Sequence, residues 1–306
     1  MQTDYQYSFR IAVATIKAPW FFEIGEALTD ALLDMGHNAV LEVDTVENLT
    51  KRWTAPSNST WIVLTPEIYH HLPANAIAYN LEQLDARASH VPPAALHHLA
   101  DTCRKSRCVW DFSMRNMQFW AAHDIPAVHV PIGYTPRMTY PVSMSAEGSR
   151  LVFIGTVYGR RQMLIDEVKQ AVGADRFDLI TDAYCYGDAR LGQAHASSKI
   201  SALASACLAV NIKPVAPELT CTETSRLWWC IANRVFVISE ADGDEEGMRP
   251  FKEAGIPFVN ADRLAPLTAE LMAEAPDRLV DRATAALNYL RSNYRYTKAL
   301  EGKCTM

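Results

Sequence analysis

The chain has 306 residues, which exceeds the usual size of one compact domain, so two domains of about 150 residues each are expected. Hydrophobic residues make up 49% and charged residues 21%, a globular composition that argues against extensive disorder. The formal net charge of -6 gives no overall attraction to nucleic acid, so we expect no nucleic-acid partner.

The N-terminus lacks the features of a targeting segment. Residues 1–5 contain no basic region followed by an apolar run, and no later stretch reaches the roughly 20 apolar residues that span a bilayer. We therefore expect a cytoplasmic protein without a transmembrane segment.

The first half of the chain predicts one α/β domain. Short apolar runs alternate with segments of helical period, as in buried parallel strands joined by crossover helices. A helix is predicted over residues 21–35, ending at Gly36. The predicted strands are residues 9–16, 39–43, 61–65, 76–80, 108–112 and 127–131. These elements predict a Rossmann-like domain over residues 1–140.

Sequence patterns also predict the domain boundary and the elements of the second half of the chain. Residues 133–148 lose periodicity and collect proline, serine and glycine, which is typical of a connection between domains. After it, strands are predicted at 151–155, 177–181, 208–212 and 235–239, with helices at 161–171, 197–205, 223–232 and 277–294. We expect a second Rossmann-like domain over residues 149–306, whose last helix packs across the boundary. The predicted fold class is α/β, with two doubly wound domains that face a cleft.

Several standard catalytic motifs are absent from the sequence. Neither G-x-G-x-x-G nor G-x-x-x-x-G-K-[ST] follows any predicted strand, and there is no G-x-S-x-G or H-E-x-x-H. The seven cysteines include no C-x-x-C pair, so neither a disulfide framework nor a zinc site is indicated. If the protein binds a phosphate group, it must therefore do so without a glycine-rich loop.

The start of a predicted helix in the second half is a candidate phosphate-binding site. Residues 220–226 follow the predicted strand 208–212 and a loop, on the side where ligands gather in open parallel sheets. The free N-H groups and the dipole of a helix N-terminus favour an anion. The alternative is purely structural, because Thr220 and Glu223 fit the S/T-x-x-E capping box.

These residues carry a resemblance to a known family. Residues 208–240, which read LAVNIKPVAPELTCTETSRLWWCIANRVFVISE, resemble the nucleotide-sugar segment of CgeB-like glycosyltransferases, a group with the GT-B fold. The resemblance implies that Glu223 binds the donor ribose and that Thr222 and Thr224 lie near the phosphates. It implies that Arg226 braces the loop or contacts phosphate.

Two positions depart from the family pattern. Lys213 stands where the family commonly has histidine, and Arg234 stands where it commonly has glycine. A lysine still neutralises a diphosphate as a point charge, so Lys213 stays a donor-binding candidate.

Two further stretches resemble the same family. Residues 151–161 are similar to its first strand and basic turn, which implies that Gly155, Arg160 and Arg161 lie at the donor phosphates. The alternative for both arginines is a solvated charge at a helix start, although cations there oppose the helix dipole.

The second of these stretches surrounds a pair of tyrosines. Residues 184–190 and 198–200 resemble the part of the family that borders the base and the diphosphate, which implies that Tyr184 or Tyr186 stacks on the base and that Lys199 contacts the donor. A tyrosine that covers the core edge and a solvated lysine are the alternatives.

The first half supplies candidates for a catalytic base. Residues 79–84, 110–113 and 130–134 are also similar to family landmarks, and each places polar residues at a predicted strand end. Glu23, Glu82 and Asp111 are the candidates, with Glu67 and His70 as further options. For Glu82 and Asp111 the alternative is hydrogen bonding to loop backbone.

Together these features predict a glycosyltransferase that needs no metal. The predicted donor substrate is a nucleoside diphosphate sugar, UDP- or dTDP-linked, with no bound cofactor, and the acceptor is a hydroxyl of a glycan or a protein. The nearest approach to a metal-binding Asp-x-Asp motif, Asp242-Gly243-Asp244, is interpreted as part of a solvated charge run. A GT-B-fold sugar-nucleotide epimerase and a catalytically silent binding module are the alternatives, and the oligomeric state is open.

Overall fold

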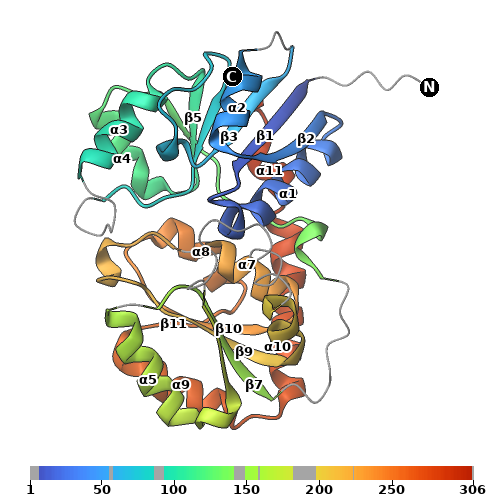
Figure 1. The fold of residues 1–306 in the computed structure, drawn as a ribbon. Coiled ribbons are helices and arrows are strands. Elements are labelled where there is room, and N and C mark those ends of the chain that lie inside the picture. The colour runs from blue at the N-terminus through green and yellow to red at the C-terminus, as the bar shows by residue number, and fades with distance from the viewer. Residues whose placement is uncertain are drawn as a thin grey trace. The chain divides into compact units, whose positions relative to one another are not determined.

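The computed structural model describes residues 7–54, 58–85, 93–140, 149–157, 159–181, 198–222 and 224–304, with only the backbone of residues 18–20. The chain forms two units (Figure 1). The first consists of Met1–Arg137 and Arg295–Met306, and the second of Met138–Tyr294. Each unit is an α/β domain, as expected.

The first unit is built on a parallel sheet with the strand order β2-β1-β3-β4-β5-β6. Its strands are β1 (Ser8–Ala14), β2 (Asn38–Asp44), β3 (Thr60–Leu64), β4 (Ile77–Asn80), β5 (Cys108–Asp111) and β6 (Ala127–His129). Its helices are α1 (Ala18–Asp34), α2 (Val46–Trp53), α3 (Pro93–Cys103), α4 (Met117–Ala122) and α11 (Tyr296–Leu300), with short 3-10 turns η1 (Pro66–Ile68) and η2 (Met114–Asn116) and the turn η3 (Pro136–Met138), which ends in the second unit.

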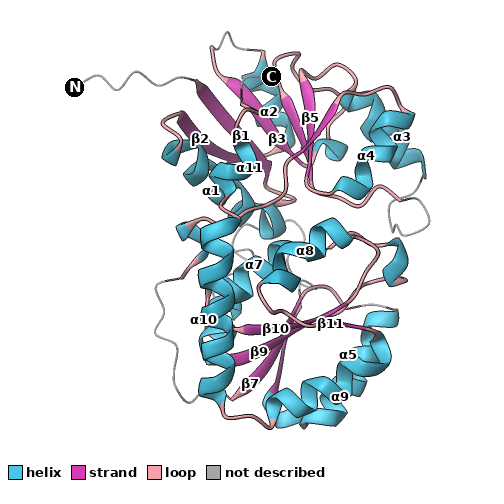
Figure 2. Ribbon diagram, turned by 180° about the vertical axis from the view of Figure 1, so that it is seen from behind, coloured by secondary structure: helices cyan, strands magenta, loops and turns pink. Residues whose placement is uncertain are grey.

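Helices cover both faces of this sheet because its strands are apolar on both faces. One core joins alternate β1 residues, such as Ala12, to Leu49 of α2, Leu99 of α3 and Trp120 of α4. The other face carries α1 and α11, which contact each other (Figure 2). A parallel sheet buried on both faces reads in the sequence as continuous apolar runs, which is why its strands were predictable.

The second unit repeats this architecture with the strand order β11-β10-β9-β7-β8, again all parallel. Its strands are β7 (Arg150–Ile154), β8 (Phe177–Ile180), β9 (Ala206–Asn211), β10 (Phe236–Glu240) and β11 (Phe258–Val259). Its labelled helices are α5 (Arg160–Val172), α7 (Thr224–Ala232), α8 (Glu245–Glu253), α9 (Ala261–Met272) and α10 (Pro276–Asn293), with 3-10 turns η4 (Ala174–Arg176) and η5 (Pro217–Leu219). Residues 198–205 are mainly helical as well. Helices α5 and α9 pack together, and α10 packs with α7 against β9 and β10.

The C-terminal segment departs from the expected domain limits. The apolar stripe of α10 packs on α7, α8, β9 and β10 of its own unit, and the chain then enters the first unit as α11. The expectation that all of residues 149–306 form one domain is therefore wrong for residues 295–306.

Tyr296 anchors this returning segment in the first unit. It is fully buried, its hydroxyl lies 2.9 Å from that of Tyr79, and its N-H donates to the carbonyl of Tyr134. A Cβ at Gly133 would lie 2.6 Å from the Tyr296 backbone, so the close approach of the two segments requires glycine there.

Candidate active site

The second sheet has its topological switch point between β7 and β9. The chain continues from β7 to β8 on one side and reaches β9 on the other, so the connections diverge at the carboxyl ends of β7 and β9. In open parallel sheets this is where ligands bind. Most of the residues predicted to hold a donor follow these two strands. Gly155, Arg160 and Arg161 come after β7, and Lys213 and residues 222–226 come after β9, whereas Tyr186 and Lys199 come between β8 and β9 in the sequence.

Arg160, the first residue of α5, is held by a buried carboxylate. Its guanidinium donates to both oxygens of Glu240, with Nη1 2.8 Å from Oε2, and it also donates to the carbonyl of Lys213 at 3.3 Å. The hydrogen bonds and the charge of Glu240 raise the pKa of Arg160 against the opposing effect of burial. The Arg160 side chain stays 29% exposed, so a fixed positive charge is accessible at this edge.

Arg161 instead binds backbone carbonyl groups. It is buried, and its guanidinium donates to the carbonyls of Ile212 at 2.7 Å and Thr156 at 2.9 Å. These bonds join the segment after β7 to the segment after β9. The alternative of solvated arginines at the start of α5 is therefore not what the structure has at either position.

Arg226 and Gly155 form one packed unit near the switch point. Arg226 donates to the side-chain oxygen of Asn211, the last residue of β9, and its guanidinium lies 5.3 Å from the ring centroid of Phe153. Gly155 has a φ of +143°, and a Cβ at this position would lie 2.6 Å from Nη2 of Arg226. Gly155 therefore makes room for Arg226, in line with a bracing role for this arginine.

The start of α7 differs from the capping box that was the structural alternative. The helix begins at Thr224, whereas Thr220 ends the turn η5 and donates its hydroxyl to the carbonyl of Pro217 at 2.9 Å. The structural alternative, in which Thr220 caps the helix, is therefore not what the structure has, because the hydroxyl of Thr220 is bonded within the preceding 3-10 turn. Glu223 lies outside the described residues, as do Tyr184 and Tyr186.

The two threonines predicted near phosphate have different surroundings. The hydroxyl of Thr222 donates to Asp242 at 3.1 Å, and its N-H donates to Asp244 at 3.2 Å. The hydroxyl of Thr224 is buried and has no hydrogen-bond partner within the described part of the chain. An unpaired buried hydroxyl costs free energy, so Thr224 calls for an explanation.

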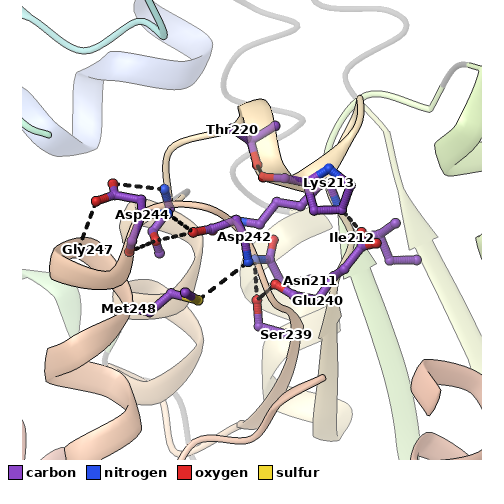
Figure 3. Close-up of polar contacts among 12 residues, drawn as sticks. Asn211, Ile212, Lys213, Thr220, Ser239, Glu240, Asp242, Asp244, Gly247 and Met248 are labelled. Carbon is purple, nitrogen blue, oxygen red and sulfur yellow. Dashed lines mark hydrogen bonds and ion pairs between the residues drawn. The ribbon is translucent and has the colours of Figure 1, made fainter. Parts of the chain in front are cut away.

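The two aspartate side chains of the acidic loop after β10 are buried, although Gly243 between them is exposed, and Figure 3 shows their polar contacts. The Asp242 side chain has no exposure and lies against Lys213, while Asp244 caps α8 by accepting from the N-H of Gly247. The interpretation of this aspartate pair as part of a solvated charge run is therefore wrong. Lys199 is also buried, with Nζ 5.6 Å from the ring centroid of Trp229.

In the first unit, Asp111 is the centre of a closed hydrogen-bond network. One carboxylate oxygen accepts from the side chains of Asn80 at 2.8 Å and Trp120 at 2.6 Å, and the other accepts from the N-H of Ser113 and the side chain of Asn116. Burial raises the pKa of Asp111 to about 7 against the effect of these bonds. A fully buried carboxylate with four donors is a structural group, which favours the backbone-binding alternative for Asp111.

Glu82 belongs to a second charged cluster at the same edge. Its carboxylate lies 3.3 Å from Nζ of Lys17, which also lies 2.9 Å from the buried carboxylate of Glu67. Burial lowers the pKa of Lys17, but the two glutamates outweigh this effect and raise it. The Glu82 side chain is 23% exposed. Glu23 lies half-buried on α1.

Two kinds of feature are absent from the described residues. They contain no group of three or more His, Cys, Asp or Glu side chains placed to hold a metal ion. None of the described helices combines the length and apolar character that crossing a membrane requires.

Comparison with solved structures identifies the architecture. The chain is similar to an alpha-glucosyltransferase in complex with UDP and a 13-mer DNA containing an HMU base, with 9% identity over 97% of this chain and 98% of that one, at a TM-score of 0.66. It is similar to Anabaena Alr3699/HepE in complex with UDP and glucose, with 11% identity over 98% and 99% of the chains, at a TM-score of 0.65. The chain has the GT-B fold.

A third similarity covers only part of a longer protein. TarM matches with 11% identity and a TM-score of 0.53, over 87% of this chain and 54% of TarM. No protein-family model matches the sequence, and no curated protein matches it either. At these identities the similarity establishes the GT-B fold alone.

The hydrogen-bond and ion-pair partners of the predicted residues were not predicted from the sequence. Glu240, Asn211 and Asp242 bind Arg160, Arg226 and Lys213 respectively, and none of the three was a candidate. Glu240 and Asn211 lie at or next to the ends of predicted strands and within residues 208–240, the segment that carries the family resemblance.

Proposed function

We propose that the protein is a CgeB-like glycosyltransferase that transfers a sugar from a nucleoside diphosphate donor to a hydroxyl acceptor. The observation that carries the proposal is the buried hydroxyl of Thr224, which has no hydrogen-bond partner among the described residues. It lies at the first position of α7, on the sheet edge where Arg160 keeps an accessible charge. A hydroxyl, the N-terminus of a helix and a guanidinium are partners that suit a diphosphate.

Each of these groups has its own role in the proposed donor site. Arg160 and the N-terminus of α7 stabilise the charge that develops on the leaving diphosphate as its bond to the sugar breaks. The family resemblance assigns the donor ribose to Glu223 and the base to Tyr184 or Tyr186. UDP is our first choice of carrier over dTDP, because the similar HepE and alpha-glucosyltransferase structures contain UDP.

The first unit supplies the acceptor side in this proposal. Glu82 is the proposed base that takes the proton from the acceptor hydroxyl as the new glycosidic bond forms, since its carboxylate is partly exposed and oriented by Lys17. Asp111 holds the preceding strand end through Asn80. We propose a glycan or protein acceptor in the cytoplasm rather than nucleic acid, in keeping with the net charge of -6.

The test of this function is the variant Thr224→Val, which replaces the unpaired hydroxyl by a methyl group of similar size. The free energy of unfolding should stay level or rise, because the buried polar atom is removed. UDP affinity should fall by about tenfold, because a hydrogen bond to the charged diphosphate is lost. Calorimetry with UDP and denaturant unfolding measure the two effects.

A matched control is Thr268→Val. Thr268 is also buried, but its hydroxyl donates to the carbonyl of Leu264 within α9. It should lose stability and keep UDP affinity. Unchanged UDP binding by Thr224→Val would contradict the donor site.

Product analysis then separates the reaction classes. Wild-type protein is incubated with UDP-, dTDP-, GDP- and CMP-sugars, with and without glycan, protein and DNA acceptors. Transfer that requires a glycan or protein acceptor supports the proposal. An isomerised sugar nucleotide from donor alone would indicate an epimerase, and failure to bind any of the nucleotides would indicate a silent module.

A further inference from the structure

A fully buried ion pair joins two loops beside the proposed donor site. Lys213 lies two residues beyond the end of β9, and Asp242 lies two residues beyond the end of β10. Nζ of Lys213 lies 2.5 Å from Oδ2 of Asp242, and both side chains have no exposure (Figure 3). Within the described residues, neither atom has another hydrogen-bond partner.

Stability alone does not account for such a pair. Removing two charges from water costs several kcal/mol per ion, and apolar side chains of similar volume commonly serve the folded state equally well. Burial raises the pKa of Asp242, and the nearby Lys213 only partly offsets that effect. What a buried pair provides in return is one defined geometry for the segments that carry it.

On one side, the pair leads to the segment before α7. The second carboxylate oxygen of Asp242 accepts from the hydroxyl of Thr222 at 3.1 Å and from the N-H of Asp244 at 2.8 Å. Asp244 in turn accepts from the N-H of Thr222 at 3.2 Å. Thr222, two residues before the start of α7, is thus held through both its side chain and its backbone.

On the other side, the backbone of Lys213 is bonded to Glu240 and Arg160. Its N-H donates to Glu240 at 3.0 Å, and its carbonyl accepts from Arg160 at 3.3 Å. A single residue therefore connects the accessible arginine of α5 to the segment that leads into α7.

We propose that Lys213 and Asp242 are positioning residues of the donor site, which hold Arg160 and the start of α7 in the arrangement that binds one diphosphate. This inference rests on the proposed function and replaces the sequence-based expectation that Lys213 itself contacts the donor. The two roles differ in the effect expected when Asp242 loses its charge.

The experiment compares UDP affinity in Lys213→Met, Asp242→Asn, the double variant and Lys213→Arg. If the pair positions the site, both single changes weaken UDP binding by about tenfold, and the double variant is no weaker than either, because all three break one coupled unit. Lys213→Arg keeps the cation beside Asp242, so its UDP affinity should fall less than that of Lys213→Met. The control is Lys252→Met, which removes an exposed ion pair with Glu245 in α8 and should leave affinity unchanged.

The sign of the Asp242→Asn effect decides between the roles. A lysine that binds the diphosphate is released by this change, so UDP would bind more tightly. Tighter or unchanged binding in Asp242→Asn overturns the inference. Should the single variants fail to fold, the double variant decides, because it leaves no uncompensated buried charge. Wild-type affinity in the double variant also overturns the inference.

Hydrogen exchange separates this inference from the proposed function. In Asp242→Asn without nucleotide, amides of residues 218–222 should exchange faster than in wild type, because the contacts of Thr222 are loosened. Unchanged exchange there overturns the positioning role whatever the protein binds. Faster exchange in a protein whose wild-type form binds no nucleotide supports the structural link and contradicts the proposed function alone.

Discussion

At the scale of single residues, the charged side chains at both sheet edges are defined by their partners. Arg160 has the same formal charge as Arg161, yet one is accessible and paired with Glu240 while the other is buried against backbone carbonyls. Asp111 and Glu82 differ in the same way, since Asp111 is closed in by four donors and Glu82 is partly exposed beside Lys17. Environment therefore separates groups that read alike in the sequence.

Asp111 should make stability depend on pH. Folding raises its pKa from 3.8 to about 7, so between these values the folded protein binds a proton that the unfolded chain has lost. The stabilising contribution of this proton is complete below the unfolded pKa and disappears as pH rises through the folded pKa. From pH 5 to pH 8 the contribution of Asp111 should fall by about 3 kcal/mol, because two units of the shift lie in that window.

The comparison that isolates this effect is with Asp111→Asn, which does not ionise. Urea unfolding of both proteins at pH 5 and pH 8 gives the difference in free energy of unfolding at each pH. The advantage of wild type should be larger at pH 5. An advantage that is the same at both pH values would mean that the pKa of Asp111 is equal in the folded and unfolded states.

At the scale of elements, most of the sheets and little of the site were predictable. Strands such as β3 and β10 were located to within one residue because they are buried on both faces and read as apolar runs. Helices α8 and α9 were missed, and each carries a proline inside, at Pro250 and Pro266, that breaks the usual helical pattern. The pair of Arg160 and Glu240 spans 80 residues, and no local periodicity encodes such a contact.

The turn after β7 gives a test at this scale. Gly155→Ala adds a Cβ 2.6 Å from the guanidinium of Arg226, which must then leave its position beside Asn211. We expect a loss of stability of about 1 kcal/mol or more from the positive φ, together with weaker UDP binding. Thermal unfolding and calorimetry measure the two effects.

Gly159→Ala is the matched control for this variant. Gly159 also has a positive φ, of +51°, but a Cβ there meets nothing within 4 Å. It should lose a similar amount of stability from backbone strain and keep UDP affinity. Equal affinities in the two variants would show that Arg226 has no part in the donor site.

At the scale of the whole molecule, the two units are linked by chain continuity at two places. The first unit is assembled from residues far apart in the sequence, because the chain leaves it near Arg137 and returns at Arg295. Its last helix, α11, contacts α1, and the hydroxyls of Tyr79 and Tyr296 join a strand of the N-terminal half to the returning segment. The C-terminal segment is therefore part of the folding unit that begins at the N-terminus.

Tyr296→Ala tests this organisation. It removes a fully buried aromatic ring, so the first unit should lose about 3–5 kcal/mol of stability. Hydrogen exchange should accelerate in β4 and β5 and stay unchanged in β9 and β10, because units with separate cores open separately. The control is Tyr289→Ala on α10, whose ring is 36% exposed and bonded to Glu253, and which should cost far less. Loss of protection in β9 and β10 to the same extent as in β4 and β5 would mean that the chain unfolds as one cooperative body. It would contradict the claim that the C-terminal segment stabilises the first unit specifically.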